Sequence, residues 1–323
     1  MNVGITYDLK VDYIKEGYTE EEVLEFDKPE TIDGIENALI ELGYKTTRIG
    51  NIRSLVSRLS NGERWDIVFN IAEGLNGIGR EAEVPAILEA YNIPYTFSDP
   101  LVLSLSLHKA MAKRVIRDAG ILTPDFCLVE SMGELKTFDL TFPVFAKPVA
   151  EGTSKGINKD SKINNKRELE KIVKEMLLKY SQPVIIEEFL PGREFTVGII
   201  GTGAEAKAIG ALEILLNNNA EADIYSHMNK ALYEDRVEYQ VASDESAKGA
   251  IELALKVWRV LGARDAGRVD VRIDRDGNPS FIEVNPLAGL NPDHSDLPIL
   301  CSLVGIKYVE LIDNIIKSAL KRV

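Results

Sequence analysis

The sequence is poor in the residues that build disulfide frameworks and zinc centres. Its 323 residues include 2 cysteines and 3 histidines, and the cysteines, Cys127 and Cys301, lie far apart without CxxC spacing. These counts exclude a disulfide scaffold, argue against a zinc site and are typical of a reducing compartment. No apolar run reaches membrane-spanning length, and the N-terminus lacks the basic flank and apolar core of a signal peptide. We therefore expect a cytoplasmic protein without a membrane partner.

Basic residues are also few relative to acidic ones. The chain has 38 Lys and Arg against 51 Asp and Glu, a formal net charge of −13. Nucleic acids and anionic membranes attract the opposite charge, so neither is expected as a partner. Any bound phosphate must be held by local basic residues. The length is sufficient for two or three subdomains with a cleft between them.

Apolar patterning predicts an α/β protein whose C-terminal half is α+β. Over the first hundred residues, strand-like and helix-like segments alternate as in a parallel sheet, and a Ser-Asp-Pro cluster at 98–100 marks a boundary. From residue 184 onward the pattern becomes rich in strands. The predicted strands are 3–6, 45–49, 65–70, 144–147, 184–188, 193–200 and 206–214. The predicted helices are 30–42, 51–59, 81–90, a segment that contains Lys109 and ends at Gly120, 248–261 and 308–321.

The most informative stretch is a hairpin pattern near the C-terminus. An Asp-Gly dipeptide at 276–277 lies between two alternating runs, which is a strong hairpin signal. With the turn placed there, Asp270 faces Glu283 and Arg268 faces Asn285 on one side of the ribbon. The opposite, apolar side is predicted to carry Val269, Val271, Ile282 and Val284.

Two carboxylates that face each other repel, so a fold normally keeps such a pair only where a bound group offsets the repulsion. At about 5 Å they repel by about 3 kcal/mol at an effective dielectric of about 20. A divalent cation would reverse the sign, and oxygen ligands from Asp, Glu and Asn suit Mg²⁺ or Mn²⁺. Magnesium held by few protein ligands usually completes its shell with water and phosphate, so the hairpin indicates a nucleotide. A solvated ribbon with a charged face is the alternative.

A glycine-punctuated loop follows a strand that ends in a lysine. The strand ends at Lys147, and residues 151–156 read Glu-Gly-Thr-Ser-Lys-Gly. Backbone amides and two hydroxyls in such a loop can bind phosphate oxygens, although an ordinary turn has the same composition. A lysine that ends an apolar strand favours a phosphate partner over a surface role. Lys109 is a candidate for a second phosphate contact.

Taken together and in this order, these segments resemble the ATP-grasp superfamily and, within it, the D-alanine–D-alanine ligases. The similarity runs from about Trp65 to Lys317. It implies three lobes, which we place at 1–103, 104–185 and 186–323. The first lobe holds substrate, the second carries the mobile glycine-rich loop, and the nucleotide cleft lies between the central and C-terminal lobes.

The resemblance implies an ATP site. Lys109 and Lys147 match the lysines on the α- and β-phosphates, and Glu194 matches the ribose-binding glutamate. The glycine-rich loop corresponds to Glu151, Gly152, Thr153 and Ser154, of which the last two are placed among the catalytic residues. The adenine hinge corresponds to Glu187, Glu188, Phe189 and Leu190.

The same resemblance implies metal and catalytic groups. Asp270, Glu283 and Asn285 match the ligands of two Mg²⁺ or Mn²⁺ ions. Arg268 matches the arginine that stabilises the tetrahedral intermediate, and Lys230 matches a lysine that reaches the γ-phosphate.

The amino-acid side departs from the family pattern. Gly289, His294 and Ser295 resemble the segment that binds the carboxylate of the second amino acid. The family's first signature, two glycines followed by Ser and Glu, is absent, and an acidic segment, 16–30, follows Tyr7-Asp8-Leu9. Glu73 stands where a His is usual, and Arg80 stands where an acid is usual. The acidic residues Asp8, Glu73 and those within 20–25 could receive an ammonium group, with a solvated charged loop as the alternative.

The implied activity is ATP-dependent ligation of a carboxylate to an amine through an acylphosphate, by an enzyme that is a homodimer in the cytoplasm. Its small-molecule partners are ATP and amino acids that need not be D-alanine. Two alternatives stay open, a small-molecule kinase or cyclo-ligase on the same scaffold, and a nucleotide-binding module without turnover.

Overall fold

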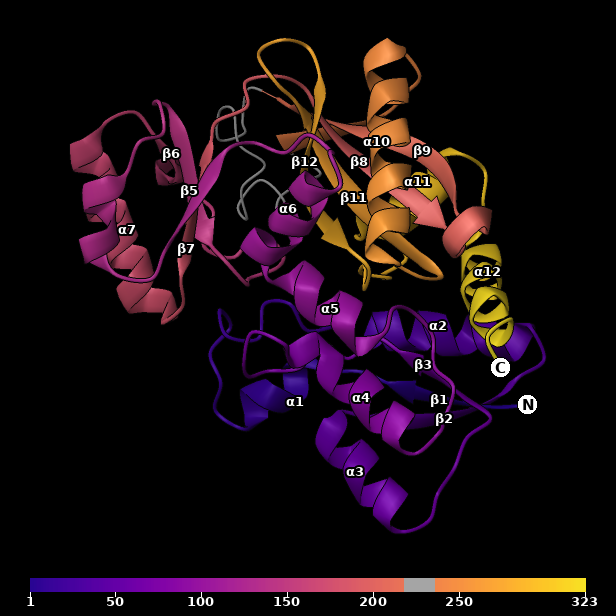
Figure 1. Cartoon of the computed structure of the whole chain (residues 1–323). Helices are drawn as coiled ribbons and strands as arrows, with labels where there is room; N and C mark the ends of the chain where they lie inside the picture. The colour runs from indigo at the N-terminus through magenta and orange to yellow at the C-terminus, as the bar shows by residue number, and fades with distance from the viewer. Residues whose placement is uncertain (218–235) are drawn as a thin grey trace.

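The computed structural model describes residues 1–217 and 236–323, and these contain three sheets (Figure 1). The first sheet has the order β2-β1-β3, with β1 at Asn2–Thr6, β2 at Lys45–Gly50 and β3 at Ile67–Asn70. Both neighbours pair parallel to β1. Val3, Ile5, Ile67 and Phe69 are fully buried, as expected for a parallel sheet covered on both faces.

Short helices connect and cover these strands. They are α1 (Lys10–Lys15), α2 (Pro29–Glu41), α3 (Ile52–Ser60), a 3-10 turn (Arg80–Ala82) and α4 (Glu83–Ala90). The start of α3 follows from the sequence, because the Asn51 side chain accepts a hydrogen bond from the Ser54 N–H. The helices α5 (Pro100–Leu107) and α6 (Lys109–Asp118) then lead out of this region.

The second sheet is antiparallel and has the order β4-β7-β5-β6. Its strands are Phe126–Val129 (β4), Val144–Pro148 (β5), Lys162–Ile163 (β6) and Val184–Glu188 (β7). Helix α7 (Lys166–Tyr180) covers one face, and 3-10 turns lie at Met132–Thr137 and Lys159–Ser161. The predicted lobe limits stay predictions; the one between residues 185 and 186 falls within β7.

The third sheet is the largest, with the order β10-β9-β8-β11-β12. Its strands are Glu194–Ile200 (β8), Lys207–Leu216 (β9), Val237–Ala242 (β10), Ala266–Ile273 (β11) and Pro279–Asn285 (β12), with a 3-10 turn at Gly203–Glu205. Helix α10 (Glu245–Leu261) packs on it, with α11 (Asp296–Leu303) and α12 (Tyr308–Leu320) following β12. Asp244 caps α10 at its start, and Gly262, with φ of 72°, ends it. The predicted α/β class with an α+β C-terminal half is confirmed.

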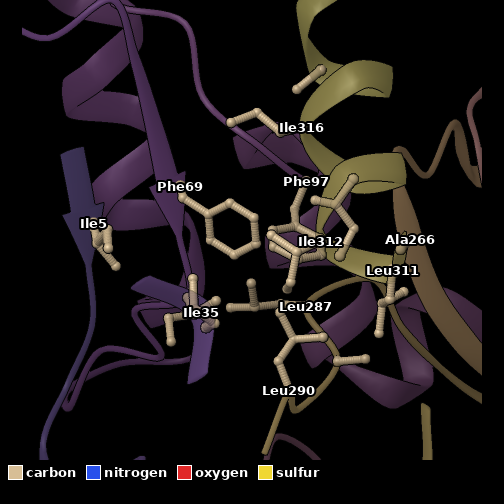
Figure 2. Close-up of a cluster of buried hydrophobic side chains, with 14 of the residues drawn as sticks. Ile5, Ile35, Phe69, Phe97, Ala266, Leu287, Leu290, Leu311, Ile312 and Ile316 are labelled. Atoms are coloured by element: carbon tan, nitrogen blue, oxygen red, sulfur yellow. The ribbon is translucent and has the colours of Figure 1, made fainter. Parts of the chain in front are cut away.

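The chain returns from the third sheet to the first. In Figure 2, Ile5, Phe69 and Ile35 from the N-terminal region pack against residues of α12 and of the segment after β12. The C-terminal contributors labelled there are Leu287, Leu290, Leu311, Ile312 and Ile316. One core therefore joins the two ends of the chain, which places the segment after the hairpin beside the N-terminal sheet. Within the described residues, no helix has the length and apolar composition needed to cross a bilayer.

Candidate active site

A small cavity of about 90 Å³ lies between the second sheet and the hairpin β11–β12. Most residues predicted to bind ATP or a metal line it. Arg272, which the sequence analysis did not assign, and Ile282, which it placed on the apolar side of the ribbon, also line it. The predicted residues among them are Lys147, Thr153, Ser154, Glu187, Glu188, Phe189, Leu190, Glu194, Arg268, Asp270 and Glu283. Residues from four separate segments are thus brought to one place.

The lysines of this region lie between carboxylates. The Lys147 ammonium is 3.5 Å from Glu187 Oε2 and 3.8 Å from Glu283 Oε2. Lys109 is 3.7 Å from Glu283 Oε2, and it also donates to the backbone carbonyl of Glu151. Burial lowers the pKa of Lys147, but Glu187 and Glu283 outweigh it and hold that pKa above its ordinary value. Lys147 therefore stays charged and is placed to meet an anion.

Lys113 is a buried charged residue next to the small cavity that the sequence analysis did not identify. It lies one helical turn after Lys109 on α6, is fully buried, and sits 3.1 Å from Glu187 Oε1. Its ammonium also donates to the Phe281 carbonyl at 3.1 Å and to the Thr123 hydroxyl at 3.0 Å. Burial lowers its pKa to about 8. The i, i+4 spacing of the two lysines was the available signal, because it places both on one face of the helix.

The adenine and ribose candidates have defined partners. Phe189 is 6% exposed. The Lys162 ammonium lies 4.2 Å from the centroid of its ring, and the Arg272 guanidinium lies 5.1 Å from it. Arg272 also pairs with Glu194 at 3.1 Å. Arg272 is a further residue that the sequence analysis missed. It fixes both the aromatic ring and the carboxylate that line this end of the small cavity.

The hairpin β11–β12 has the cross-strand residue pairs that the sequence predicted, but its connecting turn is longer than predicted. Asp270 pairs with Glu283 and Arg268 with Asn285, as predicted. However, β11 ends at Ile273 and β12 begins at Pro279, so the connection is longer than two residues. A β-bulge at Ile282 restores the register, because Val271 pairs with Phe281 while Asp270 pairs with Glu283.

The bulge overturns one prediction. Ile282 was assigned to the apolar side of the ribbon, but it lines the small cavity. Phe281 takes its place in the core with Val269, Val271 and Val284. The extra residue of the bulge breaks the alternation, so Ile282 and Glu283 both border the cavity. Lys113 and Thr123 bind the Phe281 carbonyl beside the bulge.

The oxygen donors of the hairpin fit a hard divalent cation. Asp270 is 9% exposed, and it accepts hydrogen bonds from Thr196 at 2.9 Å and from the Asn285 amide at 3.3 Å. Burial, with the nearby Glu283 and Asp296, raises the pKa of Asp270 to about 6 despite Arg268. Among described residues, no three His, Cys, Asp or Glu side chains are arranged so that they could hold a metal ion by themselves. The donor set is two carboxylates and an amide, which suits magnesium or manganese completed by water and phosphate.

The glycine-rich loop is held in a strained shape. Thr153 and Ser154 have φ of 48° and 55°, a left-handed conformation that costs residues other than glycine about 1 kcal/mol or more each. The Gly152 N–H donates a hydrogen bond to the Glu25 carboxylate. The Arg80 guanidinium donates to the same carboxylate at 2.6 Å and to the Ala150 carbonyl at 2.9 Å. The loop is therefore fixed from the N-terminal region. Glu151 and Gly152 do not line the small cavity, and the Glu151 carboxylate pairs with Lys155.

A larger cavity of about 510 Å³ adjoins the small one. Thr153 and Arg268 line both cavities, so the two meet at these residues. The large cavity also contains Asn285 and every residue predicted to bind the amino-acid substrates, namely Glu73, Gly289, His294 and Ser295. Its volume is within the range of about 300–1,000 Å³ that is typical of small-molecule sites.

Carboxyl groups from the N-terminal region line the large cavity. They include Asp27, Glu73 and Glu81, none of which forms an ion pair with any residue of 1–217 or 236–323. Burial, with Glu81 and Glu25 nearby, raises the pKa of Glu73 well above its ordinary value. Burial also raises the pKa of Asp27 and of Glu81 to about 7 each. A cationic group beside them would favour their ionised forms and lower these pKa values.

Asp8, which the sequence analysis named as a possible partner for an ammonium group, does not lie at the large cavity. Its carboxylate is 2% exposed and accepts hydrogen bonds from the Tyr13 hydroxyl and the Gly74 N–H. It holds the turn after β3 and does not line the large cavity. Glu25 does line it, but Glu25 is paired with Arg80.

The loop after β12 also lines the large cavity. Asn291, which the sequence analysis missed, organises this loop: its N–H donates to Ser295 Oγ and its side-chain oxygen accepts from the His294 N–H. Its amide donates to Thr31 of α2. At Gly289 a Cβ atom would lie 2.8 Å from Ser295 Oγ, so the close approach requires glycine. Lys230 lies outside the described residues.

The sequence is similar to those of known proteins. The family model described as "D-ala D-ala ligase C-terminus" matches residues 115–317. A D-alanine–D-alanine ligase of Aquifex aeolicus is 32% identical over 284 residues, covering 87% of this chain and 92% of that protein. A protein of Sinorhizobium fredii described as uncharacterized is 32% identical over 300 residues, covering 90% and 87%.

Solved structures show the same fold. The D-alanine–D-alanine ligase of Bacillus anthracis superposes with a TM-score of 0.75 at 22% identity, covering 100% of this chain and 98% of that one. The VanG D-Ala:D-Ser ligase of Enterococcus faecalis gives 0.74 at 20% identity, covering 98% and 99%. The chain therefore has the ATP-grasp fold and belongs to the D-alanine–D-alanine ligase family.

Proposed function

We propose that this protein is an ATP-dependent ligase that joins the carboxylate of one amino acid to the amine of another. The carboxylate attacks the γ-phosphate of ATP to give an acylphosphate, and the amine then displaces phosphate. One observation carries the proposal: the small cavity and the large cavity meet at Thr153 and Arg268. A γ-phosphate at the end of the first cavity would lie beside a substrate in the second.

The residues of the small cavity suit ATP. Lys147 and Lys109 would bind the phosphates, because both ammonium groups lie near Glu283 at the base of the cavity. The segment 187–190 would contact adenine, and Glu194 would bind the ribose. Glu151 and Gly152 belong to the loop that would cover the phosphates, and Thr153 and Ser154 would contact the transferred group. Phosphoryl transfer depends mainly on positioning and charge neutralisation, which these groups supply.

Asp270, Glu283 and Asn285 are the residues that would hold Mg²⁺ or Mn²⁺, in the number of two that the family suggests. A divalent cation there would neutralise the phosphate charge. The pairing of Asp270 with Glu283 and of Arg268 with Asn285 supports this assignment, because it brings the oxygen atoms of two carboxylates and one amide to neighbouring strands. Lys230, which the sequence assigns to the γ-phosphate, remains part of the proposal.

The large cavity would hold the amino acids. Glu73, with Asp27 and Glu81, would receive an ammonium group, because these carboxylates have no ion-pair partner among the residues that the structure describes. Gly289, His294 and Ser295, which line the same cavity, would bind the carboxylate of the second amino acid. Arg268, between the two cavities, would stabilise the oxyanion of the tetrahedral intermediate.

The test is a substrate panel with purified protein, ATP and Mg²⁺. We expect phosphate release only with particular pairs of D- or L-amino acids, together with a new amide product in mass spectra. Three carboxyl groups line the large cavity and could bind more than one ammonium group. The panel therefore includes diamino acids as well as alanine and serine. ADP formed with a stably phosphorylated product would instead indicate a kinase, and nucleotide binding without turnover would indicate a non-catalytic module.

Assembly and location are part of the proposal. We expect a homodimer, which sedimentation equilibrium would detect, and a cytoplasmic enzyme, which cell fractionation would locate. A monomer at all concentrations, or recovery with the membranes, would contradict these two points and leave the chemistry unaffected.

A further inference from the structure

Asp296 is the first residue of α11 and borders the large cavity. It is 4% exposed, and its Oδ2 lies 2.6 Å from Arg268 Nη1. The Tyr239 hydroxyl donates to Oδ1 at 3.3 Å. A buried carboxylate needs such partners, and the free N–H groups at the start of the helix favour a negative charge there. Asp296 is therefore a buried carboxyl group held in place beside the arginine that lines both cavities.

Arg268 has a second acidic neighbour. The same Nη1 atom lies 3.6 Å from Oδ2 of Asp270, the predicted metal ligand. Two carboxylates thus compete for one guanidinium, and Asp296 has the shorter contact. An arginine that closed on Asp270 would neutralise the charge that a cation requires, and it would occupy one ligand oxygen.

We infer that Asp296 is a positioning residue that holds Arg268 away from Asp270, so that Asp270 stays open to the metal and Arg268 points to the junction of the two cavities. The inference rests on the proposed function. It also explains how an arginine and a metal ligand can lie two residues apart on one strand, on the same face, without cancelling each other.

The experiment compares Asp296→Asn with the wild-type protein. Asparagine keeps the size of the side chain but removes the charge that holds Arg268. We expect the apparent Mg²⁺ affinity, measured by calorimetry with a non-hydrolysable ATP analogue, to fall by about tenfold. Binding of the analogue without Mg²⁺ should be unchanged. The kcat should fall while KM for ATP at saturating Mg²⁺ is retained, and Asp296→Glu should recover part of the loss.

Two further variants make the test specific. In an Arg268→Met background, Asp296→Asn should have no additional effect on Mg²⁺ affinity, because Asp296 acts through Arg268. Asp313→Asn, which removes an aspartate that pairs with Lys317 on α12, is the matched control and should behave as wild type. Unchanged Mg²⁺ affinity in Asp296→Asn, or an equal loss in the Arg268→Met background, would overturn the inference. If the wild-type protein itself binds nucleotide without any dependence on Mg²⁺, the proposed function fails first.

Discussion

The small cavity and the large cavity differ in how their charges are paired. At the small cavity, Lys147 lies between Glu187 and Glu283, and the buried Lys113, which does not line the cavity, also pairs with Glu187. In the large cavity, Asp27, Glu73 and Glu81 have raised pKa values and no ion-pair partner in residues 1–217 or 236–323. The charge of Lys147 suits an anionic ligand, and these three carboxyl groups suit a ligand that brings a positive charge.

The largest expected effect is at the hairpin. Asp270→Asn removes one of two facing carboxylates, and turnover should fall by about a thousandfold or more because the metal loses a charged ligand. Burial raises the pKa of Asp270 to about 6, so its ionised form costs the folded state free energy at neutral pH. The free energy of unfolding without ligands should therefore rise by about 1–3 kcal/mol. Phosphate release and urea unfolding measure the two effects, and full activity in this variant would refute the metal assignment.

The next largest effect tests whether the two cavities bind different substrates. Lys147→Met keeps the buried stem but removes the ammonium between Glu187 and Glu283. The affinity for Mg-ATP should fall by about a hundredfold, since two charge-assisted contacts to phosphate are lost. The KM for the amino acids should stay within about twofold, because Lys147 lines only the small cavity. Lys166→Met, an exposed lysine at the start of α7, is the control.

A substitution in the large cavity should have the opposite pattern of effects, changing the KM of an amino acid and not the KM of ATP. Glu73→Gln should raise the KM of the amino acid that brings the ammonium group by about tenfold. The KM for ATP should not change, since Glu73 lines only the large cavity. Steady-state kinetics with each substrate varied in turn gives both values. An increase confined to ATP would break the distinction between the two cavities.

The smallest effect is a pH dependence of stability. The folded-state pKa of Glu81 is raised from 4.5 to about 7, so the folded protein holds a proton that the unfolded chain has already released. The free energy of unfolding without ligands should fall as the pH rises through this window. Glu81→Gln should reduce that fall by about 1–2 kcal/mol, whereas Glu252→Gln, at an exposed site on α10, should not alter it. Thermal unfolding at several pH values is the measurement, and parallel curves for all three proteins would contradict the assignment.

Sequence patterns predicted many of the residues that line the small cavity because that information is local. An Asp-Gly turn and alternation placed Asp270 opposite Glu283, and the family order of motifs named Lys147 and residues 187–190, which line this cavity. Their roles toward a nucleotide stay predictions. The longer turn and the bulge at Ile282 were not predictable, because they compensate each other and leave the functional pairs unchanged. Lys113 was missed because its value comes from contacts with β7 and β12, which are distant in the chain.

The sequence by itself determined the element types, the α/β class and the identity of the groups suited to phosphate, since these follow from periodicity and residue chemistry. Tertiary structure alone decided how the acidic residues are used: Asp8 accepts hydrogen bonds from Tyr13 and Gly74, Glu25 pairs with Arg80, and Asp27, Glu73 and Glu81 line the large cavity without an ion pair in the described residues. It also decided that Asp296 meets Arg268. The reason is physical. The effect of a charge depends on its distance to other charges and on its exposure to water, and only the packed chain sets both.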